Sequence, residues 1–137
     1  MFDSTPGTRD PGIPMDKNMT LATRVMLLPK DTNALGTIFG GVILSHIDLA
    51  AAVEARRHSH HRLVTVAMRE VVFHKPVFLG DVVSFYTRLI RIGTTSITVH
   101  VNVRVERPGE ADEIHVTDAE VVYVAVDDEN KKVPVRS

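Results

Sequence analysis

The stretch "FGGVILSHIDLAAAVEA", residues 39–55, decides the fold, because it holds alanine, leucine and isoleucine at helical density without a proline. A helix from residue 40 to about residue 57 would be about 27 Å long. The basic run "RRHSHHR" (56–62) then supplies the sign of charge that helix C-termini favour. Such a helix is too apolar to face water on every side, so we expect a sheet to cover it.

Five segments have the character of strands, one before the helix and four after it: residues 19–28, 62–73, 80–92, 96–106 and 114–126. In "SITVHVNVRVE" (96–106), isoleucine and valine alternate with Thr98, His100, Asn102, Arg104 and Glu106. This alternation indicates one face on the core and one in solvent, so we expect His100, and His115 on the next strand, to face solvent. Short connections imply antiparallel neighbours, and one antiparallel sheet around one helix is an α+β architecture.

Composition indicates one globular domain, with 44% hydrophobic and 24% charged residues among 137. We expect it at residues 19–130, between a disordered leader (1–18) and a polar tail (131–137). The net charge of −1 gives no field suited to nucleic acid or an anionic membrane, and no apolar run approaches a membrane span. The absence of cysteine excludes disulfides and thiolate metal sites. Without a signal-peptide pattern, the expected location is the cytoplasm.

Asp48 is the exception within the apolar helix. It shares one helix face with small residues, namely Gly41, Ser45, Ala52 and Ala55. The bulky side chains lie mostly on other faces and suit packing under a sheet: Val42, Ile43, Ile47, Leu49 and Val53. Burying an unpaired carboxylate is costly. Asp48 is therefore either satisfied by backbone N–H groups or a partner subunit, or exposed to a narrow cleft as a base or nucleophile.

The pair Gly40–Gly41 opens the helix and permits close approach to its backbone. Free N–H groups of the first turn, at the positive end of the helix dipole, suit a polarised carbonyl oxygen. Asp48 lies two turns beyond Gly41, about 10 Å along the axis, so a second copy of the chain is one way to bring both groups to one atom. The alternative for these glycines is close packing of the helix against a strand.

Three segments resemble the YciA-type bacterial acyl-CoA thioesterases, relatives of the animal cytosolic acyl-CoA hydrolases. "DTNALGTIFGGVILSHID" (31–48) is similar to the family pattern of Asp-x-Asn, a glycine loop, an aromatic residue before Gly-Gly, and an Asp within the helix. "VTVAMREVVFHKPVFLGD" (64–81) and "RIGTTS" (91–96) match later segments. The sequence departs from the pattern at Thr37, where an acid is common, and at Val42, where an aromatic is common. Both positions flank the expected cleft and bear on acyl-chain preference.

The resemblance implies a hotdog fold, a dimer with a continuous sheet or a trimer of such dimers, and acyl-CoA sites at subunit interfaces. It implies that Asp48 is the catalytic carboxylate, that Asn33 of the opposing chain holds the thioester or water, and that Gly40 and Gly41 polarise the thioester carbonyl. The residues expected to bind substrate and coenzyme A are Phe39, Arg88, Arg91, Gly93, Thr94, Thr95 and Ser96. For the last group the alternative is an ordinary hairpin turn with solvated arginines.

Thioester hydrolysis to fatty acid and coenzyme A needs only water, a positioned carboxylate and an oxyanion site, so we expect no metal and no cofactor. The histidines fit that view: His58, His60 and His61 suit a helix C-terminus, and His46 lies across the helix from Asp48. His74 is a candidate for lining the cleft. Two alternatives stay open: a hotdog hydratase or dehydratase, which would pair a histidine with a carboxylate, and a non-catalytic acyl-CoA-binding protein.

Overall fold

The computed structural model describes residues 18–136, so the predicted leader lies outside the described residues except for Asn18. The elements in chain order are β1 (Thr20–Met26), the short helix η1 (Pro29–Asp31), α1 (Gly40–Ala55), the short helix η2 (Arg56–His58), β2 (Arg62–Phe73), β3 (Val82–Ile92), β4 (Ser96–Glu106) and β5 (Ile114–Val126). The predicted bounds of β2, β4 and β5 are confirmed. The α-helix ends at Ala55, two residues before its predicted end, and continues as η2.

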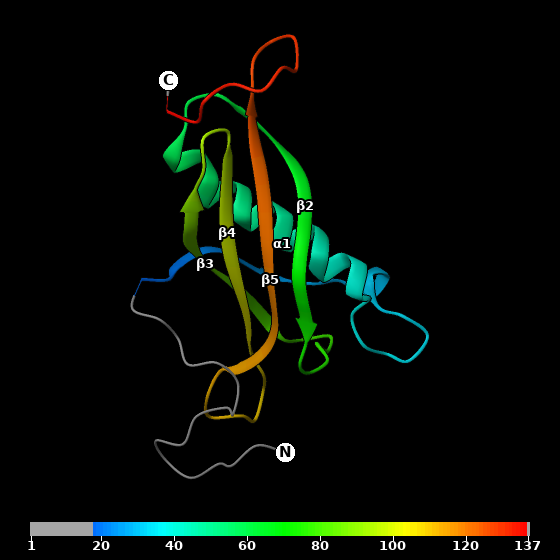
Figure 1. Ribbon diagram of the computed structural model, residues 1–137. Helices are drawn as coiled ribbons and strands as arrows, with labels where there is room; N and C mark the ends of the chain where they lie inside the picture. Colours follow the sequence, from blue (N-terminus) through cyan, green and yellow to red (C-terminus); the bar gives the residue numbers. More distant parts are fainter. Residues whose placement is uncertain (1–17, 137) are drawn as a thin grey trace.

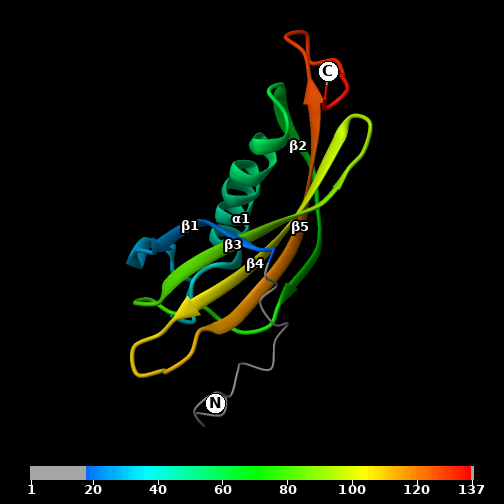
Figure 2. The ribbon, with the colours of Figure 1, turned by 90° about the vertical axis from the view of Figure 1, so that its left-hand side faces the viewer.

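The strands form one antiparallel sheet in the order β1-β3-β4-β5-β2, with α1 across one of its faces (Figures 1 and 2). Consecutive strands from β3 to β5 are neighbours, as their short connections predict. The strand β2 follows α1 and η2 in the chain and forms one edge of the sheet. The predicted α+β architecture, a sheet wrapped around one helix, is therefore confirmed.

The core lies between α1 and the concave face of the sheet. Ile43 and Ile47 of the helix are buried at 2% and 0% exposure, against the buried valines of β4. His46 stacks on Phe85 of β3, with ring centroids 5.8 Å apart. Full burial of each large apolar side chain contributes about 1.5–3 kcal/mol, so this single helix stripe fixes the helix on the sheet.

The helix is covered on one side only, which corrects the expectation that Leu49 and Val53 pack beneath the sheet. These side chains are 62% and 47% exposed. The edge strand β2 is also largely exposed, with Val66 at 56% and Phe73 at 51%. The physical reason is geometric, because one five-stranded sheet faces only one side of a helix that is apolar almost all round.

The outer face of the sheet also differs from the prediction. Thr98, Asn102 and Arg104 of β4 are buried, and His115 is 0% exposed rather than facing solvent. His100 is half-buried. Some polar side chains of this face satisfy one another, as when Arg104 Nε donates to Asn102 Oδ1 on the same strand at 3.0 Å, whereas the buried Thr98 hydroxyl has no hydrogen-bond partner among the described residues. Hydrogen-bonded polar groups tolerate burial, so alternation in the sequence does not by itself mark a solvent-facing side.

The C-terminal segment folds back onto the domain. Val135 is buried, its N–H donates to the Thr94 carbonyl at 2.9 Å, and its carbonyl accepts from Ser59 Oγ at 2.7 Å. These contacts join the β3–β4 hairpin to the chain just after η2, at one end of the molecule (Figure 1). No helix in the described part of the chain is long and apolar enough to cross a membrane.

Candidate functional site

Asp48 projects from the middle of α1 toward β5 and β2, where two hydroxyl groups hold it. Tyr123 Oη lies 2.9 Å from Asp48 Oδ1 and 2.7 Å from the Asp48 backbone carbonyl. Thr65 Oγ1 donates to the same Oδ1 at 2.9 Å. Within residues 18–136, no side chain or N–H group bonds to Oδ2. The carboxylate is thus half-buried and oriented through one oxygen, while its other oxygen stays available.

The side chain of Tyr123 is shielded from water, with 2% of its surface exposed. Burial raises the pKa of the Tyr123 phenol, and the neighbouring Asp48 carboxylate raises it further. The phenol therefore remains a neutral donor to Asp48 throughout the physiological range. Sequence reasoning identified Asp48 but missed Tyr123 and Thr65. The signal for Tyr123 was its phase with Val121 and Ala125, which places it on the helix side of the last strand.

The first turn of α1 forms the second part of the site. The Phe39 carbonyl accepts the N–H groups of Val42 and Ile43, while helix geometry leaves those of Gly40 and Gly41 without intrahelical acceptors. Gly40 packs against the ring of Phe73 of β2, where a Cβ atom would lie 3.5 Å from the ring edge. The start of α1 therefore packs closely against β2 at Gly40, while the N–H groups of Gly40 and Gly41 have no acceptor within the helix.

A small cavity of about 270 Å³ adjoins this turn. It is lined mainly by apolar side chains, and Gly40, His74 and Thr117 also contribute to its wall. His74 borders this cavity, and its predicted place in the substrate cleft stays a prediction. An apolar cavity at free helix N–H groups suits a carbonyl that carries a short hydrocarbon segment.

Asn33 lies in the loop before α1 and organises that loop. Its Oδ1 accepts the N–H groups of Leu35 at 2.9 Å and Thr37 at 3.2 Å, and its Nδ2 donates to Thr37 Oγ1 at 2.9 Å. Thr37, one of the departures from the family pattern, is thus the partner that fixes the amide. Asn33 and Asp48 share no contact within one chain, so the role that the resemblance implies for Asn33 stays a prediction about a second copy.

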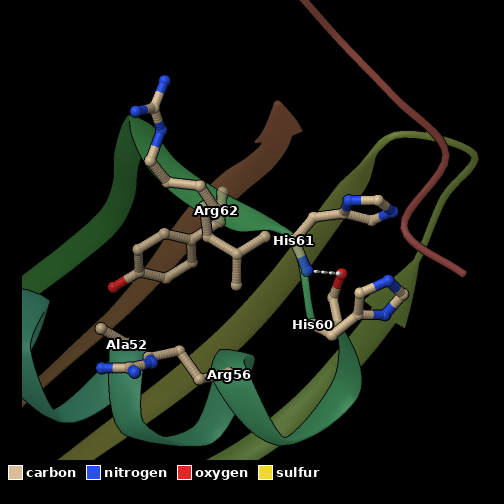
Figure 3. Close-up of a pocket in the computed structure, with 8 residues that line it drawn as sticks. Ala52, Arg56, His60, His61 and Arg62 are labelled. Carbon is tan, nitrogen blue, oxygen red and sulfur yellow. Dashed lines mark hydrogen bonds between the residues drawn. The ribbon is translucent and has the colours of Figure 1, made fainter. Parts of the chain in front are cut away.

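A larger cleft of about 670 Å³ opens beside Tyr123, between the C-terminal half of α1 and β2 (Figure 3). Ala52, one turn beyond Asp48, forms its floor, and basic or imidazole side chains rim it: Arg56, His60, His61 and Arg62. Next to it, Arg57 and Arg136 line a second open depression of about 530 Å³. Positive side chains therefore gather at the end of α1, a feature that the sequence analysis assigned only to helix capping.

The hairpin 93–96 is a tight turn at the same end of the molecule. The Gly93 N–H donates to the Ser96 carbonyl at 2.8 Å, and a Cβ atom at Gly93 would lie 2.7 Å from Ser96 Oγ. Arg91 is exposed beside it. Arg88 projects from the outer face of β3, because its neighbour Thr87 points inward and donates to Glu54 of α1 at 3.1 Å. The sheet thus separates Arg88 from Asp48.

Comparison with known proteins shows the family. Residues 35–111 match the model of the Thioesterase superfamily. The chain belongs to this superfamily. It is 39% identical over 118 residues to the acyl-CoA thioester hydrolase YciA of Salmonella typhimurium, covering 84% of this chain and 89% of that protein. The predicted resemblance to the YciA-type thioesterases is confirmed.

Solved structures of thioesterases agree with this assignment. A hexameric hotdog fold thioesterase of Campylobacter jejuni is 45% identical, with a TM-score of 0.78 over 84% of this chain and 89% of that one. A hexameric thioesterase of Yersinia pestis is 39% identical, with a TM-score of 0.82 over 92% of this chain and 100% of that one. The predicted hotdog fold is confirmed.

Proposed function

We propose that this thioesterase hydrolyses acyl-CoA thioesters to free fatty acid and coenzyme A, with Asp48 as its catalytic carboxylate. The observation that carries the proposal is the orientation of Asp48, whose Oδ1 accepts from two hydroxyl groups while Oδ2 accepts from no described residue. A carboxylate fixed in this way presents one oxygen to a water molecule or directly to an acyl carbon. Either route splits the thioester.

The proposed oxyanion site is the first turn of α1. The N–H groups of Gly40 and Gly41, with the helix dipole, stabilise the negative charge that develops on the thioester oxygen. Since two helical turns separate Gly41 from Asp48, we propose that each site combines groups from two copies of the chain, with Asn33 of the second copy at the substrate. This chemistry uses no metal and no cofactor.

The assembly that we propose is a homo-oligomer joined through β2. An exposed edge strand of 12 residues offers unpaired backbone groups to another strand. Val66 exposes its side chain on β2 itself, and Leu49 and Val53 expose theirs on α1 beside it. A β2-to-β2 dimer is the proposed unit, assembled into a trimer of dimers as in the hexameric relatives.

For coenzyme A, we propose that the cationic end of α1 holds the phosphates. Arg56 and Arg62 rim the cleft that begins at Tyr123, the residue that holds Asp48, so they suit a phosphate bound at the C-terminal end of α1. The hairpin 93–96 and Arg91, at the same end, remain proposed contacts, as do Phe39 at the helix start and Arg88 from a neighbouring subunit. The proposed setting is fatty acid metabolism, which follows from the proposed activity, in the cytoplasm.

Thiol release from a panel of acyl-CoAs, from acetyl to palmitoyl, tests the proposal. Wild type should release free coenzyme A, and Asp48→Asn should lower kcat at least about 100-fold, the contribution of a positioned base. Asp128→Asn, the same chemical change in an exposed turn, serves as the control and should retain full activity.

Outcomes that contradict the proposal are equally distinct. Interconversion of an added enoyl-CoA and its hydroxyacyl-CoA by gain or loss of water, without free thiol, would indicate a hydratase or dehydratase, and acyl-CoA binding without turnover would indicate a non-catalytic binding protein. Equal activity of wild type and Asp48→Asn, with assembly intact, would assign Asp48 a structural role instead.

A further inference from the structure

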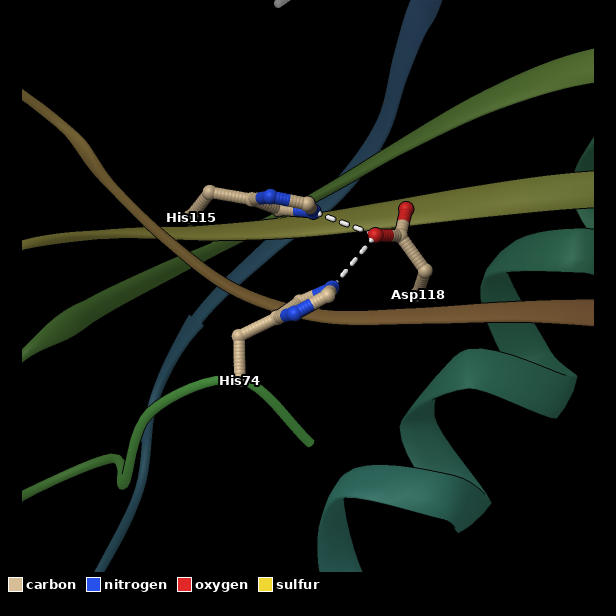
Figure 4. Close-up of side chains that lie close together, drawn as sticks. All are labelled: His74, His115 and Asp118. Atoms are coloured by element: carbon tan, nitrogen blue, oxygen red, sulfur yellow. Dashed lines mark hydrogen bonds and ion pairs between the residues drawn. The ribbon is translucent and has the colours of Figure 1, made fainter. Parts of the chain in front are cut away.

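Asp118 of β5 lies at the centre of three histidines on the outer face of the sheet. Its Oδ2 is 2.9 Å from His74 Nε2 and 2.7 Å from His115 Nε2 (Figure 4). Its Oδ1 is 2.9 Å from His100 Nε2. The histidines come from three places in the chain: the residue after β2, the middle of β4 and the start of β5. Only the fold brings them together.

We propose that His74, His115 and Asp118 form a binding site for a divalent transition metal ion of the zinc class. One ligand atom of each residue lies within 4.8 Å of the others. Imidazole nitrogen and carboxylate oxygen are the donors that zinc accepts in proteins, at about 2.0–2.2 Å. Three protein ligands leave a fourth position for water or a small anion.

The geometry needs only a small adjustment to admit the ion. Tetrahedral ligands at these bond lengths lie about 3.3 Å apart, whereas the two imidazoles now lie 2.9 and 2.7 Å from the carboxylate oxygen. Movement of about half an ångström opens the centre. His74 can widen its own gap, because its side chain is 31% exposed and it follows the end of β2. His115 is fixed in the sheet, so its gap opens by rotation of the Asp118 carboxylate.

His100 completes the site as a positioning residue. It bonds Oδ1, the oxygen that the other two histidines do not contact, and so orients the carboxylate toward them. Outer partners of this kind fix metal-ligating groups and raise affinity. This separation of roles, with two imidazoles on one oxygen and one on the other, favours a built site over a chance gathering of surface histidines.

A path from solvent to the cluster exists. An open depression of about 490 Å³ on the outer face is lined by His74, His100 and Asp118, together with Glu70 and Glu120. Glu70 lies in a β-bulge at a φ of 54°, a conformation that non-glycine residues rarely adopt. Arg69 lines the same depression and pairs with Glu120 at 3.3 Å, so the negative character of the entrance, which attracts a cation, comes from Glu70.

The cluster lies across the sheet from Asp48, and only His74 also borders the cavity at the first turn of α1. Tyr123 reaches Asp48 from the helix side of β5, so Asp118, five residues earlier, projects from the opposite face. A bound ion would join β5 to the residue that follows the edge strand β2. We therefore expect it to stabilise the fold rather than to take part in thioester hydrolysis.

Titration of metal-free protein with Zn²⁺, followed by calorimetry, tests the site. Wild type should bind one ion per chain, and His74→Gln should weaken that binding at least about tenfold. The double variant His60→Gln/His61→Gln is the control, because it removes another close histidine pair, with ring centroids 4.4 Å apart, and should bind as wild type does. Zinc should raise the Tm of wild type and control but not of His74→Gln.

Cobalt gives a second readout that needs no variant. Bound Co²⁺ in wild type should show the intense visible absorption of a four-coordinate nitrogen and oxygen site. The proposal is overturned if Co²⁺ retains the spectrum of the hydrated ion, if wild type binds no zinc, or if binding survives His74→Gln and disappears in the His60/His61 double variant. The last result would assign metal binding to the end of α1 instead.

Discussion

At the scale of single residues, the sequence identifies unusual groups but not their partners. Asp48 is conspicuous because it interrupts an apolar helix, and that was enough to select it. Its partner Tyr123 lies 75 positions further along the chain, in a strand whose pattern fits an ordinary core residue. Asp118 is similar, since its histidines come from three separate segments. Contacts between distant segments depend on strand register, which local patterns do not specify.

Tyr123 supplies the prediction that belongs at this scale. Burial and the Asp48 carboxylate raise its pKa, and burial and Glu113 raise that of Tyr86, the only other tyrosine. In Tyr86→Phe, which leaves Tyr123 alone, tyrosinate absorption should therefore appear well above pH 10, the ordinary range for tyrosine. Because the folded state holds the phenol neutral, this contribution to stability is complete below about pH 10 and is lost as the pH rises through the folded pKa.

The control variant is Asp48→Asn in the Tyr86→Phe background. Removing the carboxylate charge should move the titration of Tyr123 back toward lower pH while burial keeps it above the ordinary value. Ultraviolet titration, with circular dichroism at each pH, distinguishes ionisation from unfolding. Ionisation near pH 10 in natively folded Tyr86→Phe would show that the phenol is solvated and not bonded to Asp48.

At the scale of helices and strands, the periodicity of the sequence predicted where elements begin and end, whereas the polarity of side chains did not predict which face of the sheet is exposed. The bounds of β2, β4 and β5 followed from alternation and flanking turn residues, and the start of α1 followed from Gly40. The outer face of β4 was mispredicted because polar residues were equated with solvent. Asn102 and Arg104 instead bond to each other and are buried. The pattern cannot distinguish polar residues that face water from those that satisfy one another.

The apolar stripe of α1 leads to a stability prediction. Ile47 is fully buried between the helix and the sheet, so Ile47→Ala should lower the free energy of unfolding by about 2–5 kcal/mol through lost burial and a residual cavity. Leu35→Ala in the loop before the helix, where the side chain is 87% exposed, is the control and should cost less than about 0.5 kcal/mol. Urea unfolding at one fixed protein concentration measures both, and equal midpoints would mean that α1 is not anchored through this stripe.

At the scale of the whole molecule, one chain keeps the proposed groups of the site apart and leaves an apolar surface uncovered. Asp48 and the first turn of α1 lie two turns apart, and Asn33 contacts neither. The same side of the chain exposes Leu49 and the edge strand β2. The helical pattern alone could not reveal this, because an apolar helix looks the same whether a sheet of its own chain or a second subunit covers it. The separation of the proposed site groups and the exposed apolar surface therefore both favour the proposed assembly of several chains.

Leu49 allows this link to be tested. Its side chain is 62% exposed in one chain, one residue from Asp48, so Leu49→Glu should place a charge in the proposed interface and break the assembly into smaller species. Ala111→Lys, an exposed substitution at the β4–β5 hairpin tip, should leave the assembly unchanged. Light scattering after size-exclusion chromatography reads the mass, and thiol release from the same fractions reads the activity.

The mass and the activity of the same fractions together distinguish an effect on assembly from an effect on catalysis. If the sites need two chains, the small species of Leu49→Glu should retain native circular dichroism and lose nearly all activity, and activity should return in proportion to any oligomer that re-forms at high protein concentration. A fully active monomer would contradict the shared site, because Gly40, Gly41 and Asp48 of one chain would then suffice. An intact oligomer with a glutamate at residue 49 would instead place the interface elsewhere on the molecule.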